Sequence, residues 1–341
     1  MGPLNPQCLS PDGRWLVVLG PNVVLDLETG EAVHIARPER VGSDSLFDDF
    51  SWAPDSREFC CKFLHQPYAE FAIVSLPKMQ GRAVRFAGSH RFGMEVSAMW
   101  PCFDDGGVLA VCVDGQLKGA PLVRASLVGD TAIPQGPLLP LTSGQPDYPT
   151  RVYRSCLPQR LIVVGLQATY MADLATGQVT RLLWLQRTAA LRGHVSPRQK
   201  AGYDAVYCVG DVHPNPGGRW VYALFWPDPP NVVVRVDLKT GVPEKLGTIQ
   251  GALPRVCPSP DGTRIAFAVR ARGVAQGKAG SHICVSDPYL KRIRRLTSGK
   301  FADAMPVWNQ AGGEILFVRE YNQIWAVPIE GGEARKVWAA E

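Results

Sequence analysis

The sequence lacks the features of a membrane-spanning or exported chain. It contains no run of 18 apolar residues, so no transmembrane helix and no membrane insertion are expected. Its first residues, MGPLNPQCLSPDG, have no basic segment followed by an apolar one, so they do not form a signal peptide. These absences favour the cytoplasm without fixing the compartment, and a periplasmic protein is the alternative if an export signal once preceded this chain.

The sequence also has no C-x-x-C pair, and its nine cysteines are odd in number. Most of them lie in stretches that we expect to be strands. This pattern favours reduced, buried thiols over a disulfide framework. We therefore predict no disulfide, and we interpret the cysteines as small hydrophobic residues of a core.

Common catalytic motifs are missing as well. There is no G-x-S-x-G, no H-E-x-x-H and no G-x-x-x-x-G-K-[ST], which argues against a serine hydrolase, a zinc peptidase of that type and a P-loop nucleotide site. Charge is nearly balanced, with 36 Lys plus Arg against 31 Asp plus Glu, and this balance does not imply nucleic acid. We expect no cofactor, and we lean towards a protein that is not an enzyme.

Turn residues are abundant instead, with 34 glycines and 29 prolines spread along the whole chain. One turn recurs in front of an apolar strand: S-P-D-G stands at 10–13 before RWLVVLG and at 259–262 before TRIAFAV. Weaker copies start at 53, 104, 215 and 309, and a degenerate copy starts near 157. Proline presets φ, aspartate bonds its own backbone and glycine tolerates a positive φ, so this pattern predicts a hairpin turn.

A second turn, D-L-x-T-G, follows at 26–30, 173–177 and 237–241. Each copy lies between two short stretches rich in β-forming residues, so one unit contains four strands joined by two tight turns and one loop. The first turns recur about every 50 residues, which is typical of four-stranded blades. Seven such units, closed radially, would protect their sheet edges.

The predicted fold is therefore all-β: a seven-bladed β-propeller of four-stranded antiparallel blades, with six blades as the alternative. We expect one domain over 1–341. Its repeats would cover roughly 3–40, 46–90, 96–144, 148–184, 205–248, 252–299 and 303–340, with an insertion at 184–204. The first strand is expected near 5–9 and the last near 334–338.

These residues resemble the TolB-type, WD-repeat-like β-propeller family. The resemblance rests on the S-P-D-G turns, on the aromatic residues Trp52 and Trp308 before such turns, and on the entry L-T-S-G at 141–144 and 296–299. It covers nearly the whole chain and implies a bacterial repeat protein that binds other proteins. The family also includes transport accessories, peptidase-attached propellers and sugar-acid lyases, so the resemblance is specific for fold and weak for function.

The loops predicted at one end of the blades contain most of the irregular sequence, at 65–70, 114–121, 226–231, 270–282 and 184–204. Irregular loops on a rigid scaffold commonly carry binding sites. Basic residues in these loops and polar residues at the start of inner strands form the predicted ligand-binding or partner-binding set. That set is Asp49, Asp147, Tyr148, Arg151, Arg187, Arg192, Arg198, Tyr203, Asp204, Arg255 and Asp303. The alternatives are a solvated loop surface and aspartates that cap turns.

Two groups of residues contain side chains that could bind a metal ion. Four cysteines and His213 occupy one repeat position, but the blades would spread them around an axis, beyond the reach of one zinc ion. His65, His194 and His282 fall in the irregular loops, and as a set they would suit the metal of a lyase-like site.

The leading interpretation is a monomeric, non-catalytic scaffold that binds a protein partner or an extended acidic ligand on its loop face. The alternatives are a metal-assisted carbohydrate lyase or hydrolase at the channel mouth, which would use those histidines, and a sensor domain from a larger regulator.

Overall fold

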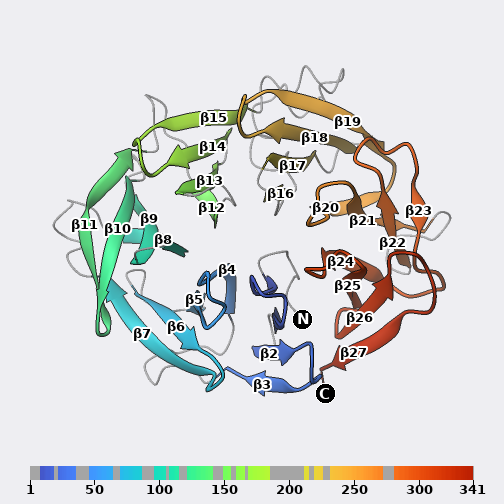
Figure 1. The fold of residues 1–341 in the computed structure, drawn as a ribbon, viewed down its shortest axis with the longest axis horizontal. Coiled ribbons are helices and arrows are strands. Elements are labelled where there is room, and N and C mark those ends of the chain that lie inside the picture. Colours follow the sequence, from blue (N-terminus) through green and yellow to red (C-terminus); the bar gives the residue numbers. More distant parts are fainter. Residues whose placement is uncertain are drawn as a thin grey trace. The chain divides into compact units, whose positions relative to one another are not determined.

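The computed structural model confirms an all-β chain built of antiparallel sheets. It describes residues 8–18, 22–35, 46–63, 70–86, 96–104, 107–114, 121–140, 149–154, 159–165, 168–184, 211–214, 219–225, 231–271 and 280–340. Among these residues there are 27 β-strands and no α-helix (Figure 1). No helix that could span a membrane occurs in this described part of the chain. The chain divides into two compact units, one ending at Arg181 and the other beginning at Leu182.

The first unit begins with a three-stranded sheet in the order β1-β2-β3 and ends within the last strand of a four-stranded sheet in the order β12-β13-β14-β15. Between them lies an eight-stranded sheet in the order β4-β5-β6-β7-β11-β10-β9-β8. The strands of the first two sheets are β1 (Trp15–Val18), β2 (Val23–Asp26), β3 (Ala32–His34), β4 (Leu46–Trp52), β5 (Glu58–Phe63), β6 (Glu70–Ser75), β7 (Gln80–Phe86), β8 (Val96–Asp104), β9 (Gly107–Asp114), β10 (Pro121–Val128) and β11 (Thr131–Pro140). The last sheet comprises β12 (Pro149–Arg154), β13 (Arg160–Gly165), β14 (Ala168–Asp173) and β15 (Val179–Trp184).

The eight-stranded sheet consists of two sets of four antiparallel strands, and the edge strand of one set pairs with the edge strand of the other. β7 and β11, the last strand of each set, pair in parallel through Thr131↔Arg85 and Ala132↔Phe86. All other pairings in this sheet are antiparallel. The short parallel contact therefore joins two units of the same local topology.

The second unit contains three four-stranded sheets, each with its strands in chain order. Their strands are β16 (Asp211–Pro214), β17 (Trp220–Phe225), β18 (Asn231–Asp237), β19 (Pro243–Ile249), β20 (Ala252–Pro258), β21 (Ile265–Arg270), β22 (Ser281–Ser286), β23 (Arg294–Arg295), β24 (Asp303–Trp308), β25 (Glu314–Arg319), β26 (Gln323–Pro328) and β27 (Arg335–Ala339). Figure 1 shows the strands of the last sheet side by side from β24 to β27.

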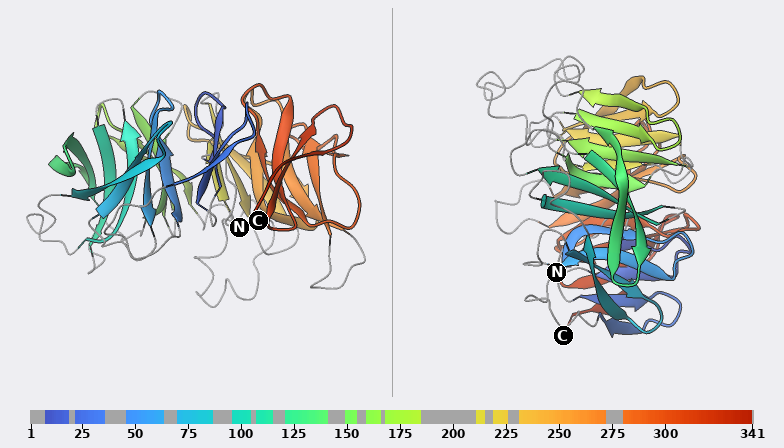
Figure 2. Two further views of the ribbon diagram at one scale, coloured as in Figure 1. Left: turned by 90° about the horizontal axis from the view of Figure 1, so that it is seen from below. Right: turned by 90° about the vertical axis from the view of Figure 1, so that its left-hand side faces the viewer.

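In every four-stranded sheet the strands lie side by side in chain order, so successive connections alternate between the two ends of the sheet. The first-to-second and third-to-fourth strand connections lie at one end, which we call the turn end; in the second unit it contains 238–242, 259–264, 287–293, 309–313 and 329–334. The second-to-third connections and the links between sheets lie at the other, the loop end, with 250–251, 296–302 and 320–322 among its described residues. Strands β20–β27, orange to red in Figure 2, run between these ends.

Apolar side chains from neighbouring sheets of the second unit form its core. Tyr222 and Val233 pack with Phe267 between the sheets β16–β19 and β20–β23. Ile283 packs with Phe317 between β20–β23 and β24–β27. Each fully buried side chain of this size contributes about 1.5–3 kcal/mol relative to exposure, so these layers fix the sheets of this unit against one another.

The side chains of five cysteines are described; all five are buried and none of them forms a disulfide: Cys8, Cys60, Cys61, Cys257 and Cys284. Burial raises the pKa of the Cys257 thiol to about 12 and that of Cys284 to about 11. These thiols are therefore protonated at neutral pH and are poor nucleophiles, which agrees with a packing role.

Candidate functional site

The S-P-D-G turns are held by their own side chains. In the copy at 259–262, Ser259 Oγ donates to Asp261 Oδ1 at 2.6 Å and accepts from the Arg264 N–H at 2.9 Å. The Thr263 N–H donates to the same Asp261 oxygen at 3.0 Å, and Gly262 has a φ of 71°. The copy at 10–13 has the equivalent bonds around Asp12. As predicted, both aspartates are structural.

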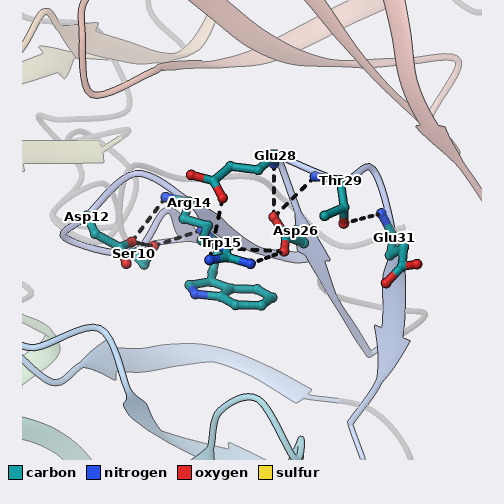
Figure 3. Close-up of polar contacts among 8 residues, drawn as sticks. All are labelled: Ser10, Asp12, Arg14, Trp15, Asp26, Glu28, Thr29 and Glu31. Carbon is teal, nitrogen blue, oxygen red and sulfur yellow. Dashed lines mark hydrogen bonds and ion pairs between the residues drawn. The ribbon is translucent and has the colours of Figure 1, made fainter.

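The D-L-x-T-G turns are satisfied in the same manner (Figure 3). Asp26 Oδ1 accepts the Glu28 N–H at 2.9 Å, while Oδ2 accepts Nη2 of Arg14 at 2.7 Å. Thr29 Oγ1 accepts the Glu31 N–H at 3.2 Å, and Gly30 has a φ of 78°. Asp173 and Asp237 repeat this arrangement with Arg160 and Arg219. Their polar atoms are occupied internally, so these turns offer little to a ligand.

Most of the predicted binding residues lie outside the described residues. These are Asp147, Tyr148, Arg187, Arg192, Arg198, Tyr203 and Asp204, together with His65 and His194 of the metal alternative. For Asp49 in β4 and Arg151 in β12, the backbone alone is described. Arg255, Asp303 and His282 are the predicted site residues whose side chains are described. The contacts of these three side chains follow.

Asp303 is 0% exposed and forms an ion pair with Arg319 at the loop end of the last sheet. Arg319 Nε donates to Asp303 Oδ1 at 2.6 Å, and Nη2 donates to Oδ2 at 3.0 Å. The pair follows from the register, which places Asp303 of β24 opposite Arg319 of β25. Both carboxylate oxygens are therefore occupied, so Asp303 organises the loop end here. Its expected direct contact with a ligand stays a prediction.

Aromatic rings enclose the Arg319 guanidinium. Its central carbon lies 4.5 Å from the ring centre of Phe301, 4.3 Å from that of Trp325 and 5.3 Å from that of Phe317. A desolvated cation–π contact contributes about 2 kcal/mol. Phe301 is nevertheless 47% exposed, and Tyr321 in the adjacent connection is 63% exposed. The loop end thus presents two exposed aromatic side chains, Phe301 against the Arg319 guanidinium and Tyr321 in the adjacent connection.

His282 lies in β22 and is nearly buried. Burial, reinforced by the charge of Arg295, lowers its pKa despite the opposing effect of Asp303, so the imidazole is neutral at pH 7. Its Nδ1 has no hydrogen-bond partner among the described residues. The same part of the chain contains no group of three potential metal ligands. The other two histidines of the metal alternative lie outside the described residues, so that alternative stays a prediction.

Arg255 lies in β20 and is partly exposed. Sequence reasoning missed Phe301, Arg319, Tyr321 and Trp325. One signal was present for Arg319, because a charged residue closes the apolar strand EILFVR. The two exposed aromatic residues carried no such signal, since single aromatic residues beside strands are more often part of a core.

Comparisons with known proteins show the fold. No family model matches the sequence, and no curated protein sequence matches it. An oligogalacturonate lyase from Vibrio parahaemolyticus aligns with a TM-score of 0.60 and 10% identity over 96% of this chain and 90% of its own. The Cps50 (Swd1) β-propeller domain of Myceliophteria thermophila aligns with a TM-score of 0.57 and 12% identity, over 98% and 96%.

TolB from Acinetobacter baumannii, at 15% identity over 94% of this chain and 64% of its own, has a TM-score of 0.45, too low to carry an argument. The higher-scoring alignments place this chain among proteins of the β-propeller kind. At 10–12% identity they show the fold alone, because such folds host both binding proteins and enzymes.

Proposed function

We propose that this chain is a seven-bladed, non-catalytic β-propeller scaffold of the TolB-like, WD-repeat-like kind. Its loop end would bind a protein partner or an extended acidic ligand. Seven blades follow if β4–β7 and β8–β11 count as two blades beside the other five sheets and the sheets close on themselves. The three arginines of the insertion at 184–204, Arg187, Arg192 and Arg198, would then contribute to one binding surface.

One observation carries this proposal: the loop end of the last two sheets exposes aromatic side chains beside basic ones. The S-P-D-G and D-L-x-T-G turns at the other end are occupied by their own internal hydrogen bonds. The loop end instead exposes Phe301 and Tyr321, with Lys300 and Arg270 also exposed at that end. Aromatic side chains with basic neighbours are enriched at protein interfaces and suit an acidic partner.

The test is a comparison of paired variants. We expect Phe301→Ser together with Tyr321→Ser to abolish cross-linking to a specific partner, identified by mass spectrometry. The control, Val242→Ser together with Val128→Ser, changes two exposed apolar residues of the turn ends and should leave the cross-links intact. Partner cross-links that survive the Phe301 and Tyr321 changes would contradict the proposal. Charge reversal at Arg187, Arg192 and Arg198 together should also weaken binding, and more so at low salt.

The enzyme alternative makes a separate prediction. A metal-assisted lyase would hold one divalent ion per chain through at least two of His65, His194 and His282. Elemental analysis of the purified protein measures that ion directly. Stoichiometric metal that disappears when those histidines are changed would replace the scaffold proposal.

A further inference from the structure

The connection between β22 and β23 differs in sequence from the other turns of this kind, and it has no role in the proposed function. It retains the aspartate of the D-L-x-T-G turn, as Asp287, but continues P-Y-L-K-R-I-R-R. We call residues 287–295 the basic turn. Asp287 Oδ1 still accepts the Tyr289 N–H at 2.9 Å, while its buried Oδ2 has no hydrogen-bond partner among the described residues. Four cations follow within five residues.

The basic turn is anchored to the preceding sheet. Arg235 of β18 donates from Nη2 to the Tyr289 hydroxyl at 2.7 Å and lies 5.0 Å from the centre of that ring. Leu290 packs on the core beside Gly247 of β19. A Cβ added at Gly247 would come within 2.9 Å of Leu290 Cδ1, so the absent side chain leaves the space that Leu290 uses. Two consecutive residues of the turn are thus fixed.

The turn is also anchored to the following sheet. Arg294 donates from Nη1 to the Glu330 carbonyl at 3.0 Å and from Nη2 to the Ile329 carbonyl. Contacts on both sides hold the intervening residues in place. A preorganised surface of this kind loses little conformational entropy on binding, which favours affinity.

The remaining cations of the basic turn are unneutralised. Lys291, Arg292 and Arg295 are exposed, and none of them forms an ion pair within the described part of the chain. Neighbouring acids are engaged elsewhere, since Glu244 pairs with Arg235 at 2.8 Å and Glu330 with Arg264 at 3.5 Å. The local potential is therefore positive on a rigid support.

Apolar surface accompanies this charge. Ile293 is 50% exposed and Tyr289 is 44% exposed, on either side of Lys291 and Arg292. β23 is also the last strand of its sheet, so an extended chain can lie along it. The phosphate groups of a nucleic acid would leave the apolar side chain of Ile293 uncovered. A nucleic-acid base would also have to compete for the Tyr289 ring, which already contacts Arg235 and Lys291. A polypeptide that alternates carboxylates with apolar residues satisfies both features.

From these contacts we propose that the basic turn docks an extended acidic segment of a partner protein. The arginine side chains would pair with its carboxylates, and Ile293 would bury one of its apolar residues. This surface lies at the turn end, so it is distinct from the loop-end site of the proposed function.

The experiment uses the full chain and a fluorescein-labelled peptide, SELESELE, in an anisotropy titration at about 50 and about 200 mM salt. We expect saturable binding that weakens with salt. Lys291→Glu, Arg292→Glu and Arg295→Glu together should weaken it about tenfold or more, since each exposed pair contributes modestly. Ile293→Ser alone should weaken it by a smaller factor. Thermal melting should change little, because these exposed side chains form no ion pair in the described part of the chain and Lys291 contributes only its exposed contact with the Tyr289 ring.

The matched control is Lys78→Glu, Lys239→Glu and Lys336→Glu, which changes the net charge equally at exposed lysines elsewhere. It should alter the affinity less than about twofold, as should Phe301→Ser with Tyr321→Ser. If both charge-reversal variants lost the same affinity for the peptide, net charge alone would explain the binding and the proposal would be overturned. Absent peptide binding would overturn it too, as would tighter binding of oligo-dT or anionic vesicles through the same three residues.

Discussion

Asp237 and Asp287 occupy corresponding turns in neighbouring sheets of the second unit, yet only one of them is fully bonded. Asp237 Oδ1 accepts the Lys239 N–H at 2.8 Å, and Oδ2 accepts Nε of Arg219 at 3.1 Å. Asp287 keeps the backbone bond through Oδ1, but its buried Oδ2 lacks a partner in the described structure. Thr263 stands where Arg14 stands in the first repeat, since its N–H donates to Asp261 as the Arg14 N–H does to Asp12, so no arginine takes the place of Arg219 beside Asp287. Arg264, one residue further along, pairs with Glu330.

The two tryptophans that precede first turns show the same difference. Trp308 Nε1 donates to the Cys257 carbonyl at 2.9 Å, whereas Trp52 Nε1 is buried with no partner among the described residues. The copies share a backbone plan, but they differ in whether each buried polar atom is matched. Complete bonding of a buried polar atom indicates a structural role for it. The unfolding free energies of variants at these positions test this difference.

The largest effect is expected at Asp303, whose two oxygens are both bonded in a fully buried pair. Asp303→Ala should lower the free energy of unfolding by about 3–5 kcal/mol, because Arg319 would keep an uncompensated buried charge. Urea unfolding measures this change. As the control, Asp303→Leu with Arg319→Met should recover most of the loss, and failure to recover it would place the cost in packing rather than charge.

The tryptophans should give the next largest difference. Replacing either one with phenylalanine removes similar ring volume, so the cavity cost is common to both changes. Trp308→Phe also leaves the Cys257 carbonyl without its donor, whereas Trp52→Phe removes an unsatisfied one. We expect Trp308→Phe to be more destabilising by about 1–3 kcal/mol in urea titrations. Equal losses would mean that Trp52 also has a hydrogen-bond partner in solution.

The turn aspartates themselves should differ less. Asp237→Ala should cost about 1–2 kcal/mol, since it removes the backbone bonds and the Arg219 pair together. Asp287→Ala should cost about half as much, because it also removes a buried oxygen that lacks a partner. The same unfolding measurement tests both changes. A larger loss at Asp287 would contradict the contrast between the two turns.

Sequence reasoning predicted what depends on local turn chemistry. S-P-D-G and D-L-x-T-G imply hairpins through φ preferences and side-chain caps, and the hairpins at Asp12, Asp26, Asp237 and Asp261 have those bonds. The last strand was expected near 334–338 and occupies Arg335–Ala339. The all-β class followed from these repeats. Blade number and radial closure stay predictions, because they depend on packing between sheets.

The candidate site was harder to predict because its parts depend on register. An aspartate that starts a strand resembles a ligand contact in the sequence, but only pairing of β24 with β25 places Asp303 opposite Arg319. Likewise, L-K-R-I-R-R reads as a solvated stretch until Arg235 and the Ile329 carbonyl are seen to anchor it. Contacts between residues that are distant in sequence decide both cases.

The smallest predicted effect is in the pH dependence of stability. Burial alone would raise the pKa of Asp237, but hydrogen bonds from Lys239 N–H, Arg219 and Thr240 N–H lower it below the ordinary 3.8. The unfolded chain therefore binds a proton at a higher pH than the folded one. The stabilisation is present above that ordinary value and is lost as pH falls through the folded pKa.

Asp237→Asn removes this titration, so the free energy of unfolding should rise less steeply than in the unchanged protein as pH increases from about 2 to about 4. Asp26→Asn should flatten the curve in the same sense, because Asp26 also has a lowered pKa, with burial outweighed by Arg14 and backbone donors. Lys239→Gln keeps the carboxylate and should leave most of the slope. Urea titrations across this range measure all three variants. A slope unchanged by Asp237→Asn would show that the bonds of this turn do not favour the ionised carboxylate, and the contrast with Asp287 would then rest on geometry alone.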